Sequence, residues 1–335
     1  MQSTRTQSLH LFNDPQTGLK AVVAIHNERL GPAMGGCRYL PYADDESAMT
    51  DAIALAQGMS YKAALAGLPL GGGKAVVMRN PHVENRAALF QALGRFIDTL
   101  QGRFVVAVDS GTSTLDMDCI AQGTPHVTST TACGDPSPHA ALGVFAGLRA
   151  TSYARLGSYN LEGLRVAIQG LGNVGYALAE QLHAAGAELL VSDLDPGRVR
   201  LAVEQLDAHP VAHDALASTP CDIFAPCAVG PVLNGHSVMQ LRCAAVAGAA
   251  NNQLTNLQVA DQLEARGILY APDYVINAGG LIHVALTPAG ETSAAIAPHI
   301  ARLPARLTDV FGHAQADTRS PARVAQTLAE RLLYT

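Results

Sequence analysis

The chain has 335 residues, of which 48% are hydrophobic and only 15% are charged, and its formal net charge is −6. Soluble proteins carry about 25% charged residues on average, so we expect self-association to cover part of the surface. The absence of a basic excess argues against nucleic acid as a partner. The polar amino-terminal stretch lacks the apolar core of a signal peptide, and no run of 18 apolar residues occurs. We therefore expect a cytoplasmic protein without a membrane span.

The six cysteines are spread along the chain and form no C-x-x-C pair, the close spacing that zinc sites and redox motifs need. The twelve histidines form no H-E-x-x-H motif. We therefore expect buried, reduced thiols and no bound metal.

The first part of the chain alternates strands and helices. β-Branched and small apolar residues predict the strands, and an apolar period of three to four residues predicts the helices. Strands are predicted at 18–27, 74–78 and 103–112, and helices at 44–67 and 84–102. This alternation is typical of an α/β domain, expected over residues 1–134, and a turn-rich segment at 131–139 suits its boundary.

Lys62 and Lys74 are the only charged residues between Ala52 and Met78. Burying an ammonium group is unfavourable unless something compensates its charge, so this pair indicates an anionic ligand or proton chemistry. The alternative is that both side chains extend to solvent. Lys62 is predicted near the end of a helix, and Lys74 directly follows three glycines, 71–73, that are predicted to form a turn.

A lysine acts as a general base only when it loses its proton near neutral pH. Two ammonium groups about 8 Å apart repel by roughly 2 kcal/mol at an effective dielectric constant near 20, so one lysine can promote deprotonation of the other. The lysine that stays protonated would then hold a carboxylate as a fixed charge. A phosphate loop, G-x-x-x-x-G-K-[ST], is excluded because Leu68 and Ala75 occupy two of its required positions.

Residues 164–195 predict a strand, a glycine turn, a helix and a second strand, with Gly170, Gly172 and Gly175 forming G-x-G-x-x-G. In a dinucleotide site these glycines allow a tight turn, the approach of a pyrophosphate and close packing of helix on strand. The helix N-terminus then faces the phosphate. A packed βαβ unit with nothing bound is the alternative.

Asp193 ends the second strand of this unit, about 20 residues after the glycine turn. At this position a carboxylate can accept hydrogen bonds from an adenosine ribose and repels the 2′-phosphate of NADP. NAD is therefore favoured as the cofactor, although Arg198 nearby leaves NADP open.

Three further buried strands are predicted in the second part of the chain, at 221–230, 244–252 and 267–280. Ligands bind beyond the carboxyl ends of strands in an open parallel sheet. Asn251, Asn252 and Asn277 follow such ends, so each faces a ligand or forms an ordinary left-handed turn.

The remaining pattern defines the expected domains. Helices are predicted from about residue 291, the last beginning at Ser320-Pro321. We expect an α/β fold of two domains with a cleft between them. Residues 135–300 would form a Rossmann domain, and a helical segment over 301–335 would pack back toward the first domain.

Several motifs occur in the order of one known family. They are GPAMGGCRYLPY (31–42), GMSYKAALAGLPLGGGKAVV (58–77), AVDSGT (107–112), QGLGNVG (169–175), APCAVG (225–230), AGAANNQL (247–254) and YAPDYVINAGG (270–280). Over residues 9–285 the chain resembles the Glu/Leu/Phe/Val dehydrogenases, most closely the leucine dehydrogenases. Such enzymes deaminate an L-amino acid oxidatively with NAD, giving a 2-oxo acid and ammonia.

The resemblance implies a role for each matching residue. Lys62 would bind the substrate carboxylate, near the segment Met34-Gly35-Gly36. Lys74 would be the general base that activates water, and Asp109 would be the second catalytic group, moving protons at the amine and ammonia. Asn252 would face the substrate. The residues implied at the NAD are Gly170, Gly172, Asn173, Val174, Gly175, Asp193, Asn251 and Asn277.

The family's side-chain pocket corresponds here to the apolar residues Met34, Ala107, Leu281 and Val284. An apolar pocket favours a branched-chain amino acid over glutamate, with leucine preferred and valine and isoleucine secondary, since each methylene changes binding by only about 1–3 kcal/mol. An aromatic amino-acid dehydrogenase and a catalytically silent NAD-binding regulator are the alternatives.

The chain departs from the family after this pocket. His283 is followed by ALTPAGETSAA, and the carboxyl-terminal region is shorter than usual. That region contributes to assembly in the family, so the resemblance does not give the subunit number; we expect a homo-oligomer, a dimer or larger. His283 either packs internally or contacts the substrate.

Overall fold

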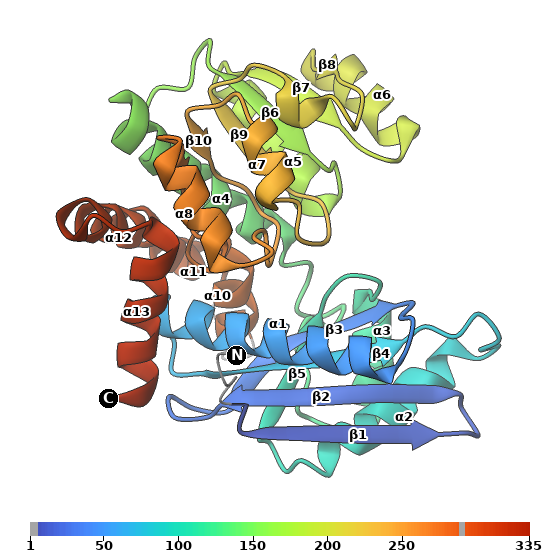
Figure 1. Ribbon diagram of the computed structural model, residues 1–335. Helices are drawn as coiled ribbons and strands as arrows, with labels where there is room; N and C mark the ends of the chain where they lie inside the picture. Colours follow the sequence, from blue (N-terminus) through green and yellow to red (C-terminus); the bar gives the residue numbers. More distant parts are fainter. Residues whose placement is uncertain (1–5, 288–291) are drawn as a thin grey trace. The chain divides into compact units, whose positions relative to one another are not determined.

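The computed structural model describes residues 6–287 and 292–335, which form two compact units (Figure 1). The first unit comprises Met1–Asp135, Val284–Glu291 and Ala329–Thr335, and the second comprises Pro136–His283 and Thr292–Leu328. Part of the sequence ALTPAGETSAA, residues 288–291, and the first five residues of the predicted polar amino-terminal stretch lie outside the described residues.

The first unit contains a mixed sheet in the order β1-β2-β4-β3-β5. Strand β2 is antiparallel to its two neighbours, β1 and β4, whereas β3 runs parallel to both β4 and β5. The strands are β1 (Ser8–Asp14), β2 (Leu19–Asn27), β3 (Ala33–Leu40), β4 (Gly71–Met78) and β5 (Phe104–Val108). Sequence analysis found β2, β5 and the second part of β4 but missed β1 and β3. In β3 the glycines and a buried arginine hide the usual strand pattern.

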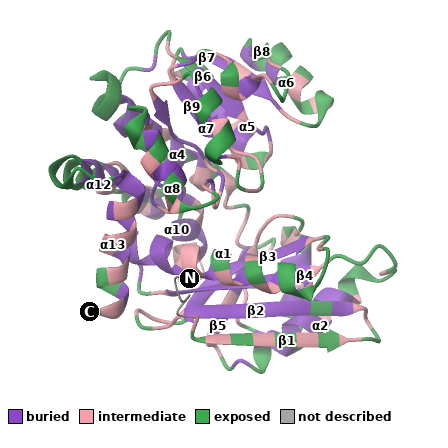
Figure 2. Cartoon of the chain, in the orientation of Figure 1, coloured by how far each residue is buried: buried purple, intermediate pink, exposed green. Residues whose placement is uncertain are grey.

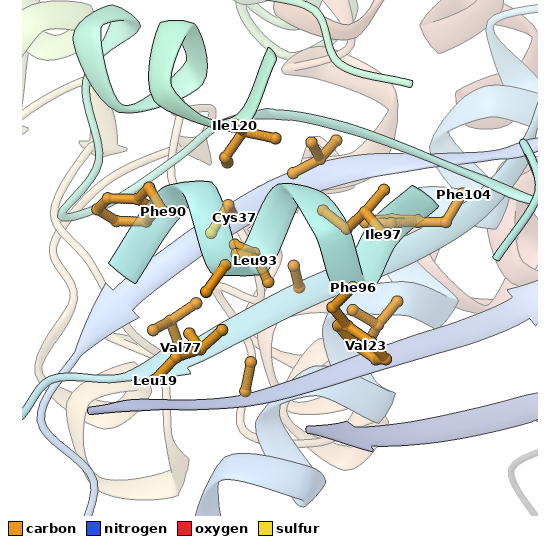
Figure 3. Close-up of a cluster of buried hydrophobic side chains, with 14 of the residues drawn as sticks. Leu19, Val23, Cys37, Val77, Phe90, Leu93, Phe96, Ile97, Phe104 and Ile120 are labelled. Carbon is orange, nitrogen blue, oxygen red and sulfur yellow. The ribbon is translucent and has the colours of Figure 1, made fainter. Parts of the chain in front are cut away.

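Three helices accompany this sheet: α1 (Asp45–Leu65), α2 (Arg86–Asp98) and α3 (Thr114–Ala121). The side chain of Asp44 caps α1 by accepting a hydrogen bond from Ser47 N at 2.7 Å. Figure 3 shows Leu93, Phe96 and Ile97 of α2 facing the side chains of the sheet. Full burial of one such side chain stabilises the fold by about 1.5–3 kcal/mol. The two helices predicted in this region are confirmed.

The three glycines at 71–73 do not form the turn that the sequence predicts; they begin strand β4. A Cβ atom on Gly71 would lie 2.1 Å from Asn27 O, and one on Gly72 would lie 2.0 Å from Ser60 N. On Gly73 it would lie 2.7 Å from the ring of Phe104. Glycine is therefore present because backbones and a ring approach the strand closely, not because the chain reverses direction.

The second unit contains a parallel sheet in the order β11-β10-β9-β6-β7-β8. Its strands are β6 (Arg165–Gln169), β7 (Glu188–Ser192), β8 (His209–Pro210), β9 (Ile223–Pro226), β10 (Ala245–Val246) and β11 (Leu269–Tyr270). In Figure 2, β6 and β9 are largely buried. This doubly wound arrangement confirms the predicted Rossmann-like fold. The strands expected at 244–252 and 267–280 reduce to two residues each, because the chain leaves the sheet early for loops and helices.

The helices of this part of the chain are α4 (Ser137–Leu156), α5 (Asn173–Ala184), α6 (Pro196–Leu206), α7 (Gly235–Gln240), α8 (Leu257–Ala265), α9 (Asp273–Ile276), α10 (Gly279–Leu286), α11 (Ser293–Ile300), α12 (Leu303–Asp317) and α13 (Pro321–Tyr334). The last helix begins at Pro321, as predicted. Its final turns belong to the first unit, where the hydroxyl of Tyr334 lies 3.2 Å from His26 Nε2. None of the helices in residues 6–287 and 292–335 is both long and apolar enough to cross a membrane.

Candidate functional site

Lys74 and Asp109 form a buried ion pair in the first unit. Lys74 lies in β4, is only 3% exposed, and its Nζ donates a hydrogen bond to Asp109 Oδ2. Asp109 directly follows β5, inside the range 103–112 for which the sequence predicts a strand. The hydroxyl of Thr112 holds this turn: it lies 2.9 Å from both Asp109 N and Cys37 O. Two residues that are 35 positions apart in the sequence thus form one group.

Arg38 is a second cation at the same oxygen of the Asp109 carboxylate. It belongs to β3, is 8% exposed, and its Nε lies 3.6 Å from Asp109 Oδ2. Its Nη1 donates to both oxygens of Asp51 in α1, at 3.2 and 2.9 Å, and the hydroxyl of Tyr42 donates to Asp51 Oδ2 at 2.6 Å. The sequence reasoning missed Arg38, although a lone charge within the otherwise apolar GPAMGGCRYL was a usable signal.

These charges determine the protonation state of Asp109. Burial by itself raises the pKa of a carboxyl group, but the Lys74 ammonium and the Arg38 guanidinium hold the pKa of Asp109 well below its usual range. Asp109 is therefore ionised at any pH at which the protein works. A carboxylate hydrogen-bonded to an ammonium, in a site with little solvent, is equipped to move protons on a bound substrate.

The glycines of β3 allow this assembly to be compact. A Cβ atom on Gly36 would lie 2.5 Å from Cβ of Asp109, and one on Gly35 would lie 1.8 Å from Gly73 O, in the strand of Lys74. The predicted segment Met34-Gly35-Gly36 therefore adjoins both members of the ion pair. Met34 itself is 5% exposed.

Lys62 lies in the last turn of α1 and is 7% exposed, so it does not extend freely into solvent. Its helix packs directly on β4, because Ser60 of α1 contacts Gly72. The structure thus positions both lysines from adjacent elements. The direct neighbour of Lys74 is nonetheless the carboxylate of Asp109, and the tuning of one lysine by the other stays a prediction.

The predicted side-chain pocket is divided between the units. Met34, Ala107 and Val284 belong to the first unit, whereas Leu281 belongs to the second. Within the first unit, Val284 O accepts a hydrogen bond from Thr128 Oγ1 at 3.3 Å. The pocket as a set of four residues stays a prediction.

The G-x-G-x-x-G segment connects β6 and α5 in the second unit, as predicted. Gly170 has φ of +99°, and a Cβ atom on Gly175 would lie 2.1 Å from Gly170 O. Gly172 precedes α5 without any side-chain cap, and apart from its chain neighbours a Cβ atom there would have, among the described residues, only Arg198 Nη1 within 4 Å, at 3.8 Å. The first N–H groups of α5, which Asn173 and Val174 begin, are therefore free of a side-chain cap, and the Gly172 position is open, as a pyrophosphate requires.

Asp193 directly follows β7, as expected, whereas Asn277 is not at a strand end: it caps the C-terminus of α9, after β11 has already ended at Tyr270. The carboxylate of Asp193 accepts hydrogen bonds from Leu171 N at 2.6 Å and Asp195 N at 2.8 Å, which fix its position beside the glycine turn. The amide of Asn277 donates to Asn251 Oδ1 at 3.0 Å. Asn277 Oδ1 is buried without a hydrogen-bond partner among the described residues, so it can accept a hydrogen bond from a ligand.

The sequence left open whether the asparagines form ordinary left-handed turns, and two of them differ in this respect. Asn252 has φ of +51° and adopts the left-handed backbone, whereas Asn277 has φ of −96° and does not. Gln253, which sequence reasoning did not single out, supports this segment. It is fully buried, and its amide donates to Gly248 O and Ala250 O, both at 3.0 Å.

His283 stacks on His139 within the second unit, with ring centroids 4.3 Å apart and planes inclined by 27°. This packing of two rings agrees with the interpretation of His283 as an internal residue. All six cysteines are free thiols. In the described ranges, no group of three or more His, Cys, Asp or Glu side chains is arranged to hold a metal ion.

Comparison with known proteins gives consistent matches along the chain. Residues 6–126 match the dimerisation domain of the Glu/Leu/Phe/Val dehydrogenases, and residues 195–297 match the Glutamate/Leucine/Phenylalanine/Valine dehydrogenase domain. The chain is 43% identical to leucine dehydrogenase from Geobacillus stearothermophilus, over 100% of this chain and 92% of the relative. It is 46% identical to leucine dehydrogenase from Bacillus subtilis (strain 168), over 85% and 79%. The crystal structure of L-tryptophan dehydrogenase from Nostoc punctiforme superposes with a TM-score of 0.81 at 40% identity, over 98% and 96%.

Proposed function

This chain belongs to the Glu/Leu/Phe/Val dehydrogenase family, and we propose that it catalyses the NAD-dependent, reversible oxidative deamination of branched-chain L-amino acids. The products are a 2-oxo acid and ammonia. Leucine is the preferred substrate, with valine and isoleucine secondary. The observation that carries the proposal is the buried, hydrogen-bonded pair of Lys74 and Asp109.

The residues of the first unit supply the acid–base chemistry of this proposal. Lys62 binds the substrate carboxylate as a fixed positive charge. Lys74 removes a proton from the water molecule that attacks the imino carbon, and Asp109 transfers a proton at the substrate nitrogen so that ammonia leaves. Burial of Lys74 restricts solvent around these transfers.

The second unit has the features that a nicotinamide dinucleotide requires. The uncapped start of α5 and the open position at Gly172 suit its pyrophosphate, and the unpartnered Asn277 Oδ1 suits a polar group of the ligand. The cofactor supplies a hydride acceptor for the α-carbon of the amino acid. Asp193 favours NAD over NADP, and Arg198 is directed toward a carboxylate of its own helix start, with Nε 3.6 Å from Asp195 Oδ2.

The apolar character of Met34, Ala107, Leu281 and Val284 supports an aliphatic substrate, as do the leucine dehydrogenases among the relatives. One observation favours a second candidate: the Nostoc L-tryptophan dehydrogenase shares the fold at 40% identity. An aromatic L-amino acid is therefore the alternative substrate. The match of residues 6–126 to a dimerisation domain supports self-association.

The test is NADH formation at alkaline pH from L-leucine, L-valine, L-isoleucine, L-phenylalanine, L-tryptophan and L-glutamate. We expect the highest kcat/KM for leucine. A higher value for phenylalanine or tryptophan would make the aromatic alternative correct, and a preference for glutamate would refute the pocket argument. Absence of turnover with every amino acid, while NAD still binds, would identify a catalytically silent regulator.

A further inference from the structure

A chain of charged and polar side chains extends from the proposed catalytic pair into α1. Asp109 Oδ2 contacts Lys74 and also lies 3.6 Å from Arg38 Nε. Arg38 in turn holds Asp51 of α1 through Nη1, and Asp51 accepts a hydrogen bond from Tyr42. The proposed function assigns no role to the last three residues.

We propose that Arg38 is a positioning residue for the reaction: it keeps the Asp109 carboxylate ionised and aligned while Lys74 gives up and regains a proton. This inference rests on the proposed function, because it assumes that Lys74 and Asp109 act on a substrate. Asp51 and Tyr42 hold Arg38 in place. Arg38 itself touches no reacting atom.

The argument begins with a change of charge during the reaction. Before Lys74 can act as a base its ammonium must give up a proton, and until the neutral amine takes a proton from water Asp109 lacks its nearest positive charge. A buried carboxylate without a compensating charge is strongly disfavoured and would take up a proton. Arg38 supplies the charge that does not change, because a guanidinium is not deprotonated in proteins.

The geometry leaves one donor of Arg38 available for this purpose. Its Nε is buried and has no hydrogen-bond partner among the described residues, and the carboxylate of Asp109 is the acceptor in front of it. A distance of 3.6 Å is slightly too long for a hydrogen bond, so a small shift of Asp109 toward Arg38 would complete one. Asp109 can thus exchange a bond to Lys74 for a bond to Arg38.

The orientation of Arg38 is determined by the other end of its guanidinium. Nη1 contacts both oxygens of Asp51, and the hydroxyl of Tyr42, 2.6 Å from Asp51 Oδ2, fixes that carboxylate. Among the described residues, the ionisable groups with an assigned interaction at Asp109 are Lys74, Arg38 and the thiol of Cys37, whose pKa burial raises, so the thiol stays neutral. The positive charge at Asp109 therefore comes from Lys74 and Arg38, and only the charge of Arg38 stays constant during the reaction.

The experiment compares Arg38→Gln, Arg38→Lys and Asp51→Asn with the wild-type enzyme, measuring kcat and KM for L-leucine across the pH range at saturating NAD. Arg103→Gln is the matched control, because it breaks another arginine–carboxylate pair of the first unit, in which Arg103 Nη2 lies 2.6 Å from Glu28 Oε2. We expect Arg38→Gln to lower kcat about 10- to 100-fold, as misalignment of a catalytic group does, with KM changed less than about threefold. The acidic limb of the kcat–pH profile of Arg38→Gln should move to higher pH.

Arg38→Lys keeps the positive charge but loses the planar guanidinium with its several fixed donors, so it should retain the wild-type pH profile with an intermediate kcat. Asp51→Asn should lower kcat with KM preserved. The proposal is overturned if Arg38→Gln keeps kcat within about twofold and an unshifted profile, or if Arg103→Gln loses as much. Should Arg38→Gln not fold, wild-type kcat and pH profile in both Arg38→Lys and Asp51→Asn would overturn it, and a kcat loss with KM preserved would support it.

A second readout separates this inference from the proposed function. If the wild type deaminates no amino acid, the proposed function fails. Urea unfolding of Arg38→Gln, Asp109→Asn and the double variant then measures the coupling between the two side chains without any turnover. Favourable coupling at pH 8 that disappears at low pH supports charge compensation of Asp109 by Arg38, and absence of coupling overturns it.

Discussion

Replacing Gly72 by alanine should damage both the fold and the site, because the backbone of α1 approaches β4 closely at this glycine. The new Cβ atom would lie 2.0 Å from Ser60 N and 2.5 Å from Ser60 Cα, and these atoms belong to a buried helix backbone. Non-bonded heavy atoms essentially never come closer than 3.0 Å to a Cβ, so the helix and strand must separate by at least 1.0 Å (3.0 − 2.0).

The separation has two measurable consequences. Overpacking of this kind lowers the free energy of unfolding by about 1–3 kcal/mol. It also displaces Lys62 of α1 relative to Lys74 of β4, and a misplacement of about 1 Å can lower catalysis about 100-fold. We therefore expect urea unfolding to show the stability loss and the leucine assay to show a kcat/KM reduced at least about tenfold.

Gly312→Ala is the matched control for this prediction. Gly312 is an exposed residue of α12, and a Cβ atom added there would meet no atom within 4 Å beyond its own stretch of helix, so alanine should raise the free energy of unfolding by about 0.5–1 kcal/mol. A Gly72→Ala protein with stability within about 0.5 kcal/mol of the wild type and unchanged kcat/KM would refute the close-approach argument.

Three further predictions concern single side chains. Burial lowers the pKa of His26 to about 4, whereas the unfolded value is about 6.5. The stability that neutral His26 contributes above pH 6.5 is therefore lost as the pH falls toward 4. In urea unfolding, His26→Gln should lack about 3 kcal/mol of this acid destabilisation, and a pH dependence equal to that of the wild type would contradict the assignment. Lys62→Ala should raise KM for leucine at least about tenfold with a smaller change in kcat, measured by steady-state kinetics; an unchanged KM would remove its carboxylate role. Asp193→Ala should narrow the NAD-over-NADP preference in kcat/KM, and undiminished discrimination would show that Asp193 does not contact the ribose.

Sequence patterns predicted correctly those helices, strands and turns whose pattern depends only on residues close together in the chain. The period of α1, the β-branched run of β2 and the glycine turn before α5 each depend on residues close together in the chain, and each was found in the structure. The pairing of Lys74 with Asp109 brings together residues 35 positions apart. Only a family resemblance could connect them before the sheet order β4-β3-β5 was known.

The failures of sequence reasoning have equally specific causes. Three consecutive glycines are typical of a turn, but at 71–73 glycine is required because tertiary contacts leave no space for a larger side chain. That information lies in α1, β2 and β5, not in the glycines. Likewise, Arg38 looked like an isolated charge in an apolar motif, and its partners Asp51 and Asp109 come from a helix and a distant turn.

The central claim is that Lys74 performs the chemistry of leucine deamination. The most direct measurement is the kcat for NADH formation from L-leucine by the wild type and by Lys74→Ala, with circular dichroism to establish that both are folded. We expect the variant to lose at least about 100-fold in kcat, the scale of a general base, while remaining folded. Near-normal turnover in the folded variant would contradict the account.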